Sequence, residues 1–94
     1  MTNSDKFEAK VRNEYNEYFI SCNRDTNRKK MSDLRQYIKE LNWVVECNET
    51  DIINRVNEGF GWCWYLGQRY TQFDLQKDKK RIKIANKIYL ELKK

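Results

Sequence analysis

The C-terminal stretch Leu75–Lys94 (LQKDKKRIKIANKIYLELKK) decides the fold that we predict for this chain. When its residues are placed on a helix at about 100° per residue, they divide into an apolar side and a basic side. The apolar side comprises Leu75, Ile82, Ala85, Ile88, Tyr89 and Leu92, and the basic side comprises Lys79, Lys80, Lys83, Lys87 and Lys94. Because the apolar side must be buried against the rest of the protein, the lysines are expected to form an exposed face.

Three further helices are predicted upstream from apolar spacings of three and four residues. The first spans residues 5–22 with Ser4 as its N-cap, and a basic loop follows over residues 23–30. The second helix starts after Ser32 and extends to about residue 47. The third places a run of apolar residues on one face, namely Ile52, Ile53, Val56, Phe60, Cys63 and Trp64.

Two short sequences resemble helix-capping motifs. Residues 48–51 (NETD) precede the predicted third helix, and residues 71–74 (TQFD) precede the C-terminal helix. The expected architecture is therefore all-α, a compact four-helix bundle that forms a single domain over residues 1–94. The alternative is an α+β fold with a short two-stranded antiparallel sheet from 43–47 and 62–66, since tryptophan and valine favour strands and glycine weakens a helix.

The composition excludes several broad classes of protein. The chain has no histidine and only three scattered cysteines, so neither a zinc site nor a disulfide scaffold is expected. Its N-terminus (MTNSDKFEAK) has no apolar run, and no segment is apolar enough to span a membrane. We expect a cytoplasmic protein, and the abundance of Lys, Asn and Ile suggests AT-rich codons from a bacterial cell or a phage-infected host.

An enzyme is not expected, because the common catalytic motifs are missing from the sequence. Without histidine there is no ordinary general base, and the cysteines lack a partner that would activate a thiolate. The sequence has no phosphate-binding glycine loop, and it has neither a D-x-D nor an E-x-x-D pattern that would indicate a paired-metal nuclease. We therefore predict no catalytic residue, no metal site and no cofactor.

The positive charge is concentrated in the second half of the chain. The net charge is +5, yet residues 1–50 carry nine basic and nine acidic side chains, whereas residues 51–94 carry ten and five. Lys79, Lys83 and Lys87 recur at every fourth residue, where like charges repel one another. Cations near the start of a helix also oppose the helix dipole unless an anion binds there. This distribution indicates contact with an anionic partner.

The first functional hypothesis is a small, non-enzymatic protein that binds the phosphate backbone of DNA or RNA. In an up-down-up-down bundle the first and third connections lie at the same end, which would bring the loop lysines and arginines close to the last helix. The predicted nucleic-acid contacts are Arg28, Lys29, Lys30, Arg69, Lys79, Lys80, Lys83 and Lys87, with Trp62 or Tyr65 stacking on bases.

The second hypothesis is an inhibitor or accessory protein from a phage or mobile element that binds a host defence protein. The host surface would be acidic or would be the groove that normally holds nucleic acid. Trp43 and Trp62 are the predicted interface residues, because Trp43 points away from the apolar stripe when residues 42–47 are helical. Self-association through Trp43 is a third alternative.

Overall fold

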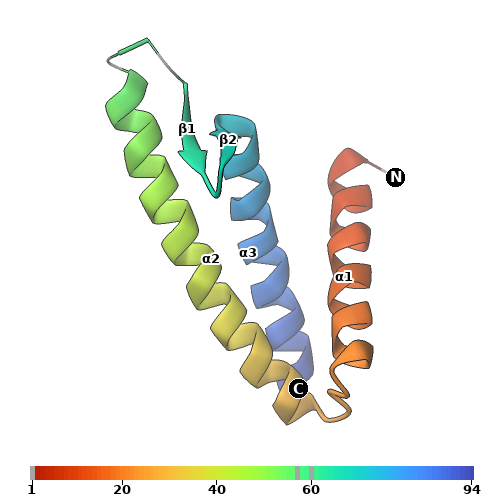
Figure 1. Cartoon of the computed structure of the whole chain (residues 1–94). Coiled ribbons are helices and arrows are strands. Elements are labelled where there is room, and N and C mark those ends of the chain that lie inside the picture. Colours follow the sequence, from red (N-terminus) through yellow and green to blue (C-terminus); the bar gives the residue numbers. More distant parts are fainter. Residues whose placement is uncertain (1, 57, 60) are drawn as a thin grey trace.

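Residues 2–56, 58–59 and 61–94 are described by the computed structural model, and this part of the chain contains three helices and a β-hairpin (Figure 1). The elements follow in the order α1 (Asn3–Ser21), α2 (Asn27–Val56), β1 (Trp62–Tyr65), β2 (Gln68–Thr71) and α3 (Gln72–Lys93). The predicted all-α four-helix bundle is therefore wrong. The alternative, an α+β fold with a short two-stranded antiparallel sheet, fits the structure.

Helix α2 continues for 30 residues through the segment 48–51 that we predicted to start a new helix. Inside the helix, the Thr50 hydroxyl donates to the Glu46 carbonyl at 3.0 Å instead of capping a following turn. Asn48 is buried and lies in register with Val45 and Ile52, so the stripe that packs on the core is not interrupted. A capping-like sequence begins a helix only where the preceding backbone is not helical, and here the backbone is helical on both sides of residues 48–51.

Helix α2 also begins earlier than predicted. The Thr26 hydroxyl accepts from the Lys29 amide at 3.3 Å, and the Thr26 carbonyl accepts from the Lys30 amide at 3.1 Å. Thr26 thus satisfies the free amides of the first turn, as an N-cap residue does. The residues predicted as a loop up to Lys30 are consequently helical from Asn27, and Ser32 lies inside the helix rather than at its cap.

The hairpin follows from the alternation of side chains in the segment WCWY, Trp62–Tyr65. Its strand β1 pairs antiparallel with β2, with Cys63 opposite Tyr70 and Trp64 opposite Arg69. Cys63 and Tyr70 are buried, so this pair marks the inner face of the hairpin. The predicted strand at 62–66 is therefore present, but its partner is β2, because residues 43–47 are helical. Phe60, predicted on an apolar helix face, lies outside the described residues.

A two-residue turn joins the strands. Leu66 and Gly67 both have positive φ, +52° and +76°, as a tight turn between right-twisted strands requires. Gly67 has the freedom at positive φ that this turn position requires. Leu66 is 84% exposed and adopts a left-handed conformation that is unfavourable for a leucine.

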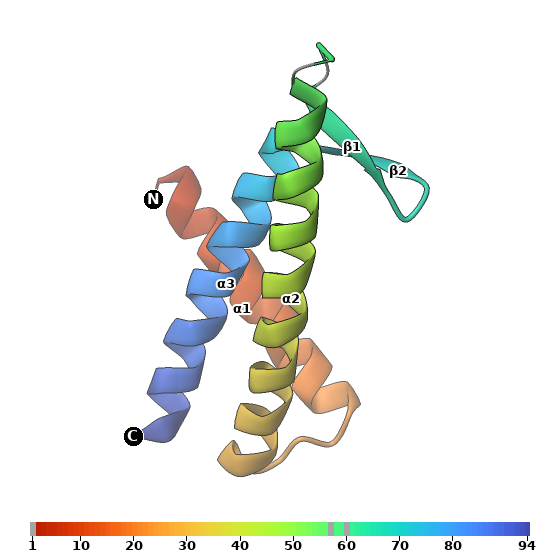
Figure 2. The same cartoon turned by 90° about the vertical axis from the view of Figure 1, so that its left-hand side faces the viewer.

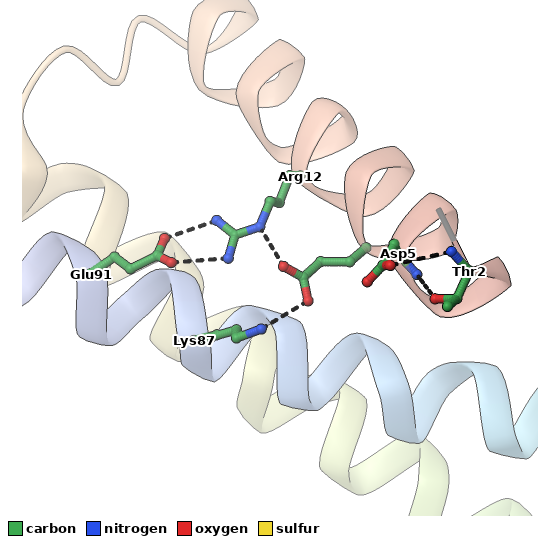
Figure 3. Close-up of polar contacts among 6 residues, drawn as sticks. Thr2, Asp5, Arg12, Lys87 and Glu91 are labelled. Carbon is green, nitrogen blue, oxygen red and sulfur yellow. Dashed lines mark hydrogen bonds and ion pairs between the residues drawn. The ribbon is translucent and has the colours of Figure 1, made fainter.

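Two capping boxes set the starts of α1 and α3. The Thr2 hydroxyl accepts from the Asp5 amide, and the Asp5 carboxylate accepts from the Thr2 amide at 3.2 Å (Figure 3). Thr2 therefore caps α1, and the prediction of Ser4 is wrong by two residues. The same reciprocal bonds join Thr71 and Asp74, so the predicted start of the C-terminal helix is confirmed.

The core consists of two clusters along the α2–α3 pair. Helix α1 contributes to the first cluster, whose buried residues are Val11, Tyr15, Phe19, Leu34, Ile84, Ala85 and Ile88. The hairpin contributes to the second cluster, whose buried residues are Val45, Ile52, Cys63, Tyr70 and Leu75. Helices α2 and α3 are common to both clusters, and α1 and the hairpin each cover one part of them.

Helix α1 is further held to α3 by ion pairs. The Arg12 guanidinium donates to both carboxylate oxygens of Glu91, at 2.8 and 3.0 Å (Figure 3). Glu8 accepts from Lys87 at 3.0 Å and from Arg12 at 3.0 Å. These four residues form one network across the helix interface, which we call the α1–α3 network.

The hairpin turn offers a direct test of backbone strain. Replacing Leu66 by asparagine should stabilise the protein by about 1 kcal/mol, because asparagine tolerates positive φ. Gly67→Ala should destabilise it, since its φ of +76° disfavours any residue with a Cβ atom. Urea denaturation followed by tryptophan fluorescence measures both changes. Equal or lower stability of Leu66→Asn would contradict the assigned turn.

Candidate functional site

The outer face of the hairpin carries a cluster of tryptophan and arginine. Because side chains alternate along a strand, Trp62 and Trp64 lie on the side opposite the buried Cys63. Arg69 lies across the ladder from Trp64, and its exposed side chain belongs to the same outer face. Arg55, near the end of α2, joins this group. We call these four residues the tryptophan face.

The side chains of the tryptophan face contact one another closely. The indole rings of Trp62 and Trp64 meet edge to face, with centroids 5.2 Å apart and planes at 88°. The Arg69 and Arg55 guanidiniums lie over the Trp62 ring, at 4.8 and 5.0 Å from its centroid. Such cation–π contacts hold the two guanidiniums in place over the indole ring. Trp64 is 58% exposed, so its ring is accessible to a partner.

This cluster contains two of the predicted nucleic-acid contacts, Trp62 and Arg69. Tyr65 differs, because it belongs to the inner face and packs against Tyr70 with ring centroids 5.8 Å apart. Trp64 was missed, since a helical register over residues 52–64 places it with the core. The alternation of WCWY as a strand is the pattern that assigns Trp62 and Trp64 to one exposed side.

The predicted lysine face is present on α3, but ion pairs occupy part of it. Lys79 donates to Glu49 on α2 at 2.5 Å, and Lys87 pairs with Glu8 on α1. Lys80 and Lys83 are exposed and form no ion pair with any residue that the structure describes. The free positive charge of this face is therefore smaller than the sequence suggests.

The lysine face borders an apolar groove between α3 and the start of α1. Its lining includes Phe7 from α1 together with Lys83, Ile84 and Leu90 from α3. The N-terminal end of α1 and the hairpin project from opposite sides of the α2–α3 pair (Figure 2). The groove and its lysines consequently lie on the other side of the molecule from the tryptophan face.

The basic residues Arg28, Lys29 and Lys30 lie at the far end of the molecule from Arg69. The Asn27 side chain donates to the Leu92 carbonyl at 3.3 Å, which places the start of α2 beside the end of α3. Arg69 instead precedes the start of α3, a helix of 22 residues or about 33 Å. The predicted proximity of these residues to Arg69 required a full-length third helix between the second helix and the C-terminal helix. The structure has a short hairpin in that part of the chain instead.

Trp43 is an exposed aromatic residue on α2, as its helical position predicted. It is 63% exposed and borders a shallow groove with Val44 and the hairpin residue Tyr65. The side chain of Lys39 lines the same groove. Trp43 and the tryptophan face are therefore separate exposed aromatic surfaces.

Neither metal binding nor membrane insertion is indicated by the described residues. Within residues 2–56, 58–59 and 61–94, no three histidine, cysteine or acidic side chains are grouped so that they could hold a metal ion. The buried thiol of Cys63 lies 3.5 Å from Asn48 Oδ1, and burial raises the pKa of this thiol, which keeps it protonated. None of the described helices combines the length and apolarity needed to cross a membrane.

Comparison of the chain with protein-family models, with curated proteins and with solved structures finds no match. No function can therefore be transferred from a relative. The chemistry of the exposed residues is the basis for the function proposed below.

The α1–α3 network should make stability depend on pH. Lys87 and then Arg12 lower the pKa of Glu8, and Arg12 lowers the pKa of Glu91, because both cations favour the ionised carboxylates. A carboxylate with a lowered folded-state pKa stabilises the protein above its unfolded pKa and loses that contribution as the pH falls. The loss should develop below about pH 4.5, the ordinary pKa of glutamate.

Urea denaturation between pH 7 and pH 3 tests this expectation. The double variant Glu8→Gln/Glu91→Gln should lose less stability on acidification than the unmodified protein does. Glu17→Gln removes an exposed carboxylate of the same helix outside the network and serves as the control. The network would be irrelevant to acid stability if the double variant and the control showed the same pH dependence.

Proposed function

We propose that this protein is not an enzyme and that it binds single-stranded nucleic acid through the tryptophan face. The observation that supports this proposal is the exposed Trp64 ring beside Trp62, with two guanidiniums stacked on Trp62. Proteins that bind single strands combine aromatic stacking platforms with positive charge along the backbone. The tryptophan face brings both features together on one exposed surface.

Each member of the tryptophan face has a chemical role in this proposal. Trp64 stacks on an unpaired base of a single strand. In a duplex the bases are paired and stacked on one another, so they are not available to the Trp64 ring. Arg55 and Arg69 contact phosphates, since a guanidinium binds phosphate through several donors in a fixed geometry. Because arginine and tryptophan restrain one another before binding, less side-chain entropy is lost when the strand arrives.

The lysines of α3 have an accessory role. Lys80 and Lys83 lie on the other side of the molecule, where they add to a positive field that attracts a polyanion. From Arg69 onward the sequence carries nine basic and three acidic residues, so this field is strongest over the C-terminal helix. The lysines therefore increase the rate of encounter, while the tryptophan face holds the strand.

Removal of one aromatic ring tests the stacking surface. Trp64→Ala should weaken binding to a labelled 12-nucleotide strand of dT or rU about tenfold, the usual loss when one stacking ring is removed. Fluorescence anisotropy at about 50 and 200 mM salt measures the affinity and its expected decrease with salt. Trp43→Ala removes an exposed ring outside the tryptophan face and should leave binding unchanged.

Two results would overturn this proposal. The first is the absence of binding to single-stranded DNA and RNA at low salt. The second is normal binding by Trp64→Ala together with loss of binding by Lys80→Glu/Lys83→Glu, which would assign the contact to the lysine face instead.

A second candidate function is docking on a host protein, as expected of a phage-encoded inhibitor or accessory protein. It is favoured by Trp43 and by Leu66, whose exposed side chain is kept at positive φ although asparagine or glycine would fit the turn better. A partner whose own surface normally binds nucleic acid would fit the positive charge of the chain. Trp43 has no role in the nucleic-acid proposal, and it therefore distinguishes the two candidates.

Nuclease treatment separates protein docking from nucleic-acid binding. If docking is the function, a partner from bacterial lysate should still copurify after nuclease digestion, and Trp43→Ala should abolish the copurification. Ile53→Ala changes another exposed apolar residue of α2 and serves as the matched control. Docking through Trp43 is excluded if both variants retain the partner or if nuclease removes it. Sedimentation of Trp43→Ala also tests self-association.

A further inference from the structure

The groove between the start of α1 and the middle of α3 combines exposed apolar surface with lysine side chains. We call it the α1–α3 groove. It has a volume of about 520 Å³ and is open to solvent. Most of its surface is apolar, although three lysines also line it. An apolar surface bordered by polar groups is typical of a site that binds another macromolecule.

The α3 side of the groove is a single stripe of the helix. Lys80, Lys83, Lys87 and Leu90 follow one another at spacings of three, four and three residues, so they lie along one side of α3. The stripe extends from residue 80 to residue 90, which corresponds to about 15 Å of helix. A partner helix of about three turns has the same length and can lie along this stripe.

Three apolar side chains line the groove and differ in how much of them a partner can cover. Ile84 is buried in the first core cluster, and Phe7 is half-buried against the same cluster. The Arg81 guanidinium lies over the Phe7 ring, 5.5 Å from its centroid, which helps to hold the ring in place. Leu90 is 58% exposed. The burial of Leu90 and of the exposed part of Phe7 therefore provides the apolar free energy of binding.

The groove carries positive charge that the described part of the protein does not neutralise. Glu8 is the one carboxylate among the described residues that line it, and it accepts from Lys87 and from Arg12, each at 3.0 Å. Lys80 and Lys83 are exposed and form no ion pair with any described residue. Two cations beside an apolar surface therefore remain for the acidic groups of a partner.

The same features argue against two other occupants. A nucleic acid would pair with the lysines, but it would place sugars and phosphates on the aliphatic Leu90, and the half-buried Phe7 ring offers no free face for stacking. A second copy of this chain that met the first groove to groove would bring Lys80 and Lys83 of both protomers together, where like charges repel.

We infer that the α1–α3 groove binds an acidic amphipathic helix of a protein partner. The apolar side of that helix contacts Leu90 and Phe7, and glutamates or aspartates beside it pair with Lys80 and Lys83. The groove and the tryptophan face lie on opposite sides of the molecule (Figure 2). The inference therefore goes beyond the proposed function and does not depend on it.

Two designed peptides serve as probes for the groove. The acidic peptide is a labelled amphipathic helix of about 14 residues, with leucines at helical spacing and glutamates elsewhere, and the basic peptide has lysine in place of each glutamate. Fluorescence anisotropy should show micromolar binding of the acidic peptide, weaker at about 200 than at about 50 mM salt, and no binding of the basic peptide. Equal affinity for both peptides, or no binding of the acidic peptide at millimolar concentration, would overturn the inference.

Leu90→Ala tests the apolar contact at an exposed position of α3. It should weaken binding of the acidic peptide about tenfold, the loss expected when a partner no longer buries a leucine side chain. Ile20→Ala changes an exposed apolar residue of α1 outside the groove and should leave the affinity unchanged. Equal affinities of these two variants for the peptide would contradict binding in the groove.

Lys80→Glu/Lys83→Glu tests the charge of the groove by reversing it. This variant should lose the acidic peptide and gain the basic one, a switch that a misfolded protein cannot produce. Lys93→Glu/Lys94→Glu makes the same change in net charge at the end of α3 and should keep the preference for the acidic peptide. The inference fails if both charge variants behave alike, since the peptides would then respond to net charge alone.

Binding of single strands of dT or rU separates this inference from the proposed function. Leu90→Ala should bind the strands normally, and Trp64→Ala should bind the acidic peptide normally. If the strands bind and the acidic peptide does not, the inference fails and the proposed function remains. If the strands do not bind and Leu90→Ala selectively loses the peptide, the inference remains without that function. Strand binding that requires Leu90 would assign the groove to nucleic acid, and self-association that Leu90→Ala abolishes would assign it to a second copy; either result overturns the inference.

Discussion

The structure depends on the burial of one continuous apolar stripe of α2 against α3. Leu34 belongs to the first core cluster, and Val45 and Ile52 belong to the second, so a single helix contributes to both. A break at the capping-like segment 48–51 would separate these contributions. Because α2 is continuous, α1 and the hairpin both pack against the same pair of helices, α2 and α3. This packing determines where the tryptophan face and the lysine face lie on the molecule.

The hairpin shows how packing on this support produces an exposed surface. Cys63 and Tyr70 pack into the second cluster, and the alternation of the strand then directs Trp62 and Trp64 outward. Burial of Cys63 and Tyr70 on the inner face of the hairpin thus determines which side chains lie on its outer face. The pairing register of β1 with β2 places Arg69 beside the tryptophans. A larger residue at Cys63 would disturb both the core and the surface that we propose as the binding site.

Ion pairs between helices alter the charge pattern that the sequence suggests. Four lysines of α3 were expected to face a partner, yet Lys79 and Lys87 pair with acidic residues of α2 and α1. The glutamates concerned, Glu49 and Glu8, are distant in the sequence, and only packing brings them within reach. Exposed pairs of this kind contribute little to stability, but they reduce the charge that is available to a polyanion.

The sequence by itself determined the features that depend on neighbouring residues. Apolar spacing predicted helix at α1, in the middle of α2 and at α3, although it also predicted a third helix over residues that form β1. The capping box at Thr71 and Asp74 predicted the start of α3, and the helical position of Trp43 predicted its exposure. Only the tertiary structure decided which segments meet. Local patterns could not show that WCWY pairs with QRYT, that Arg28 lies far from Arg69, or that Phe7 and Leu90 line one groove. These features depend on burial between distant segments, and the free energy of that burial is absent from any local pattern of residues.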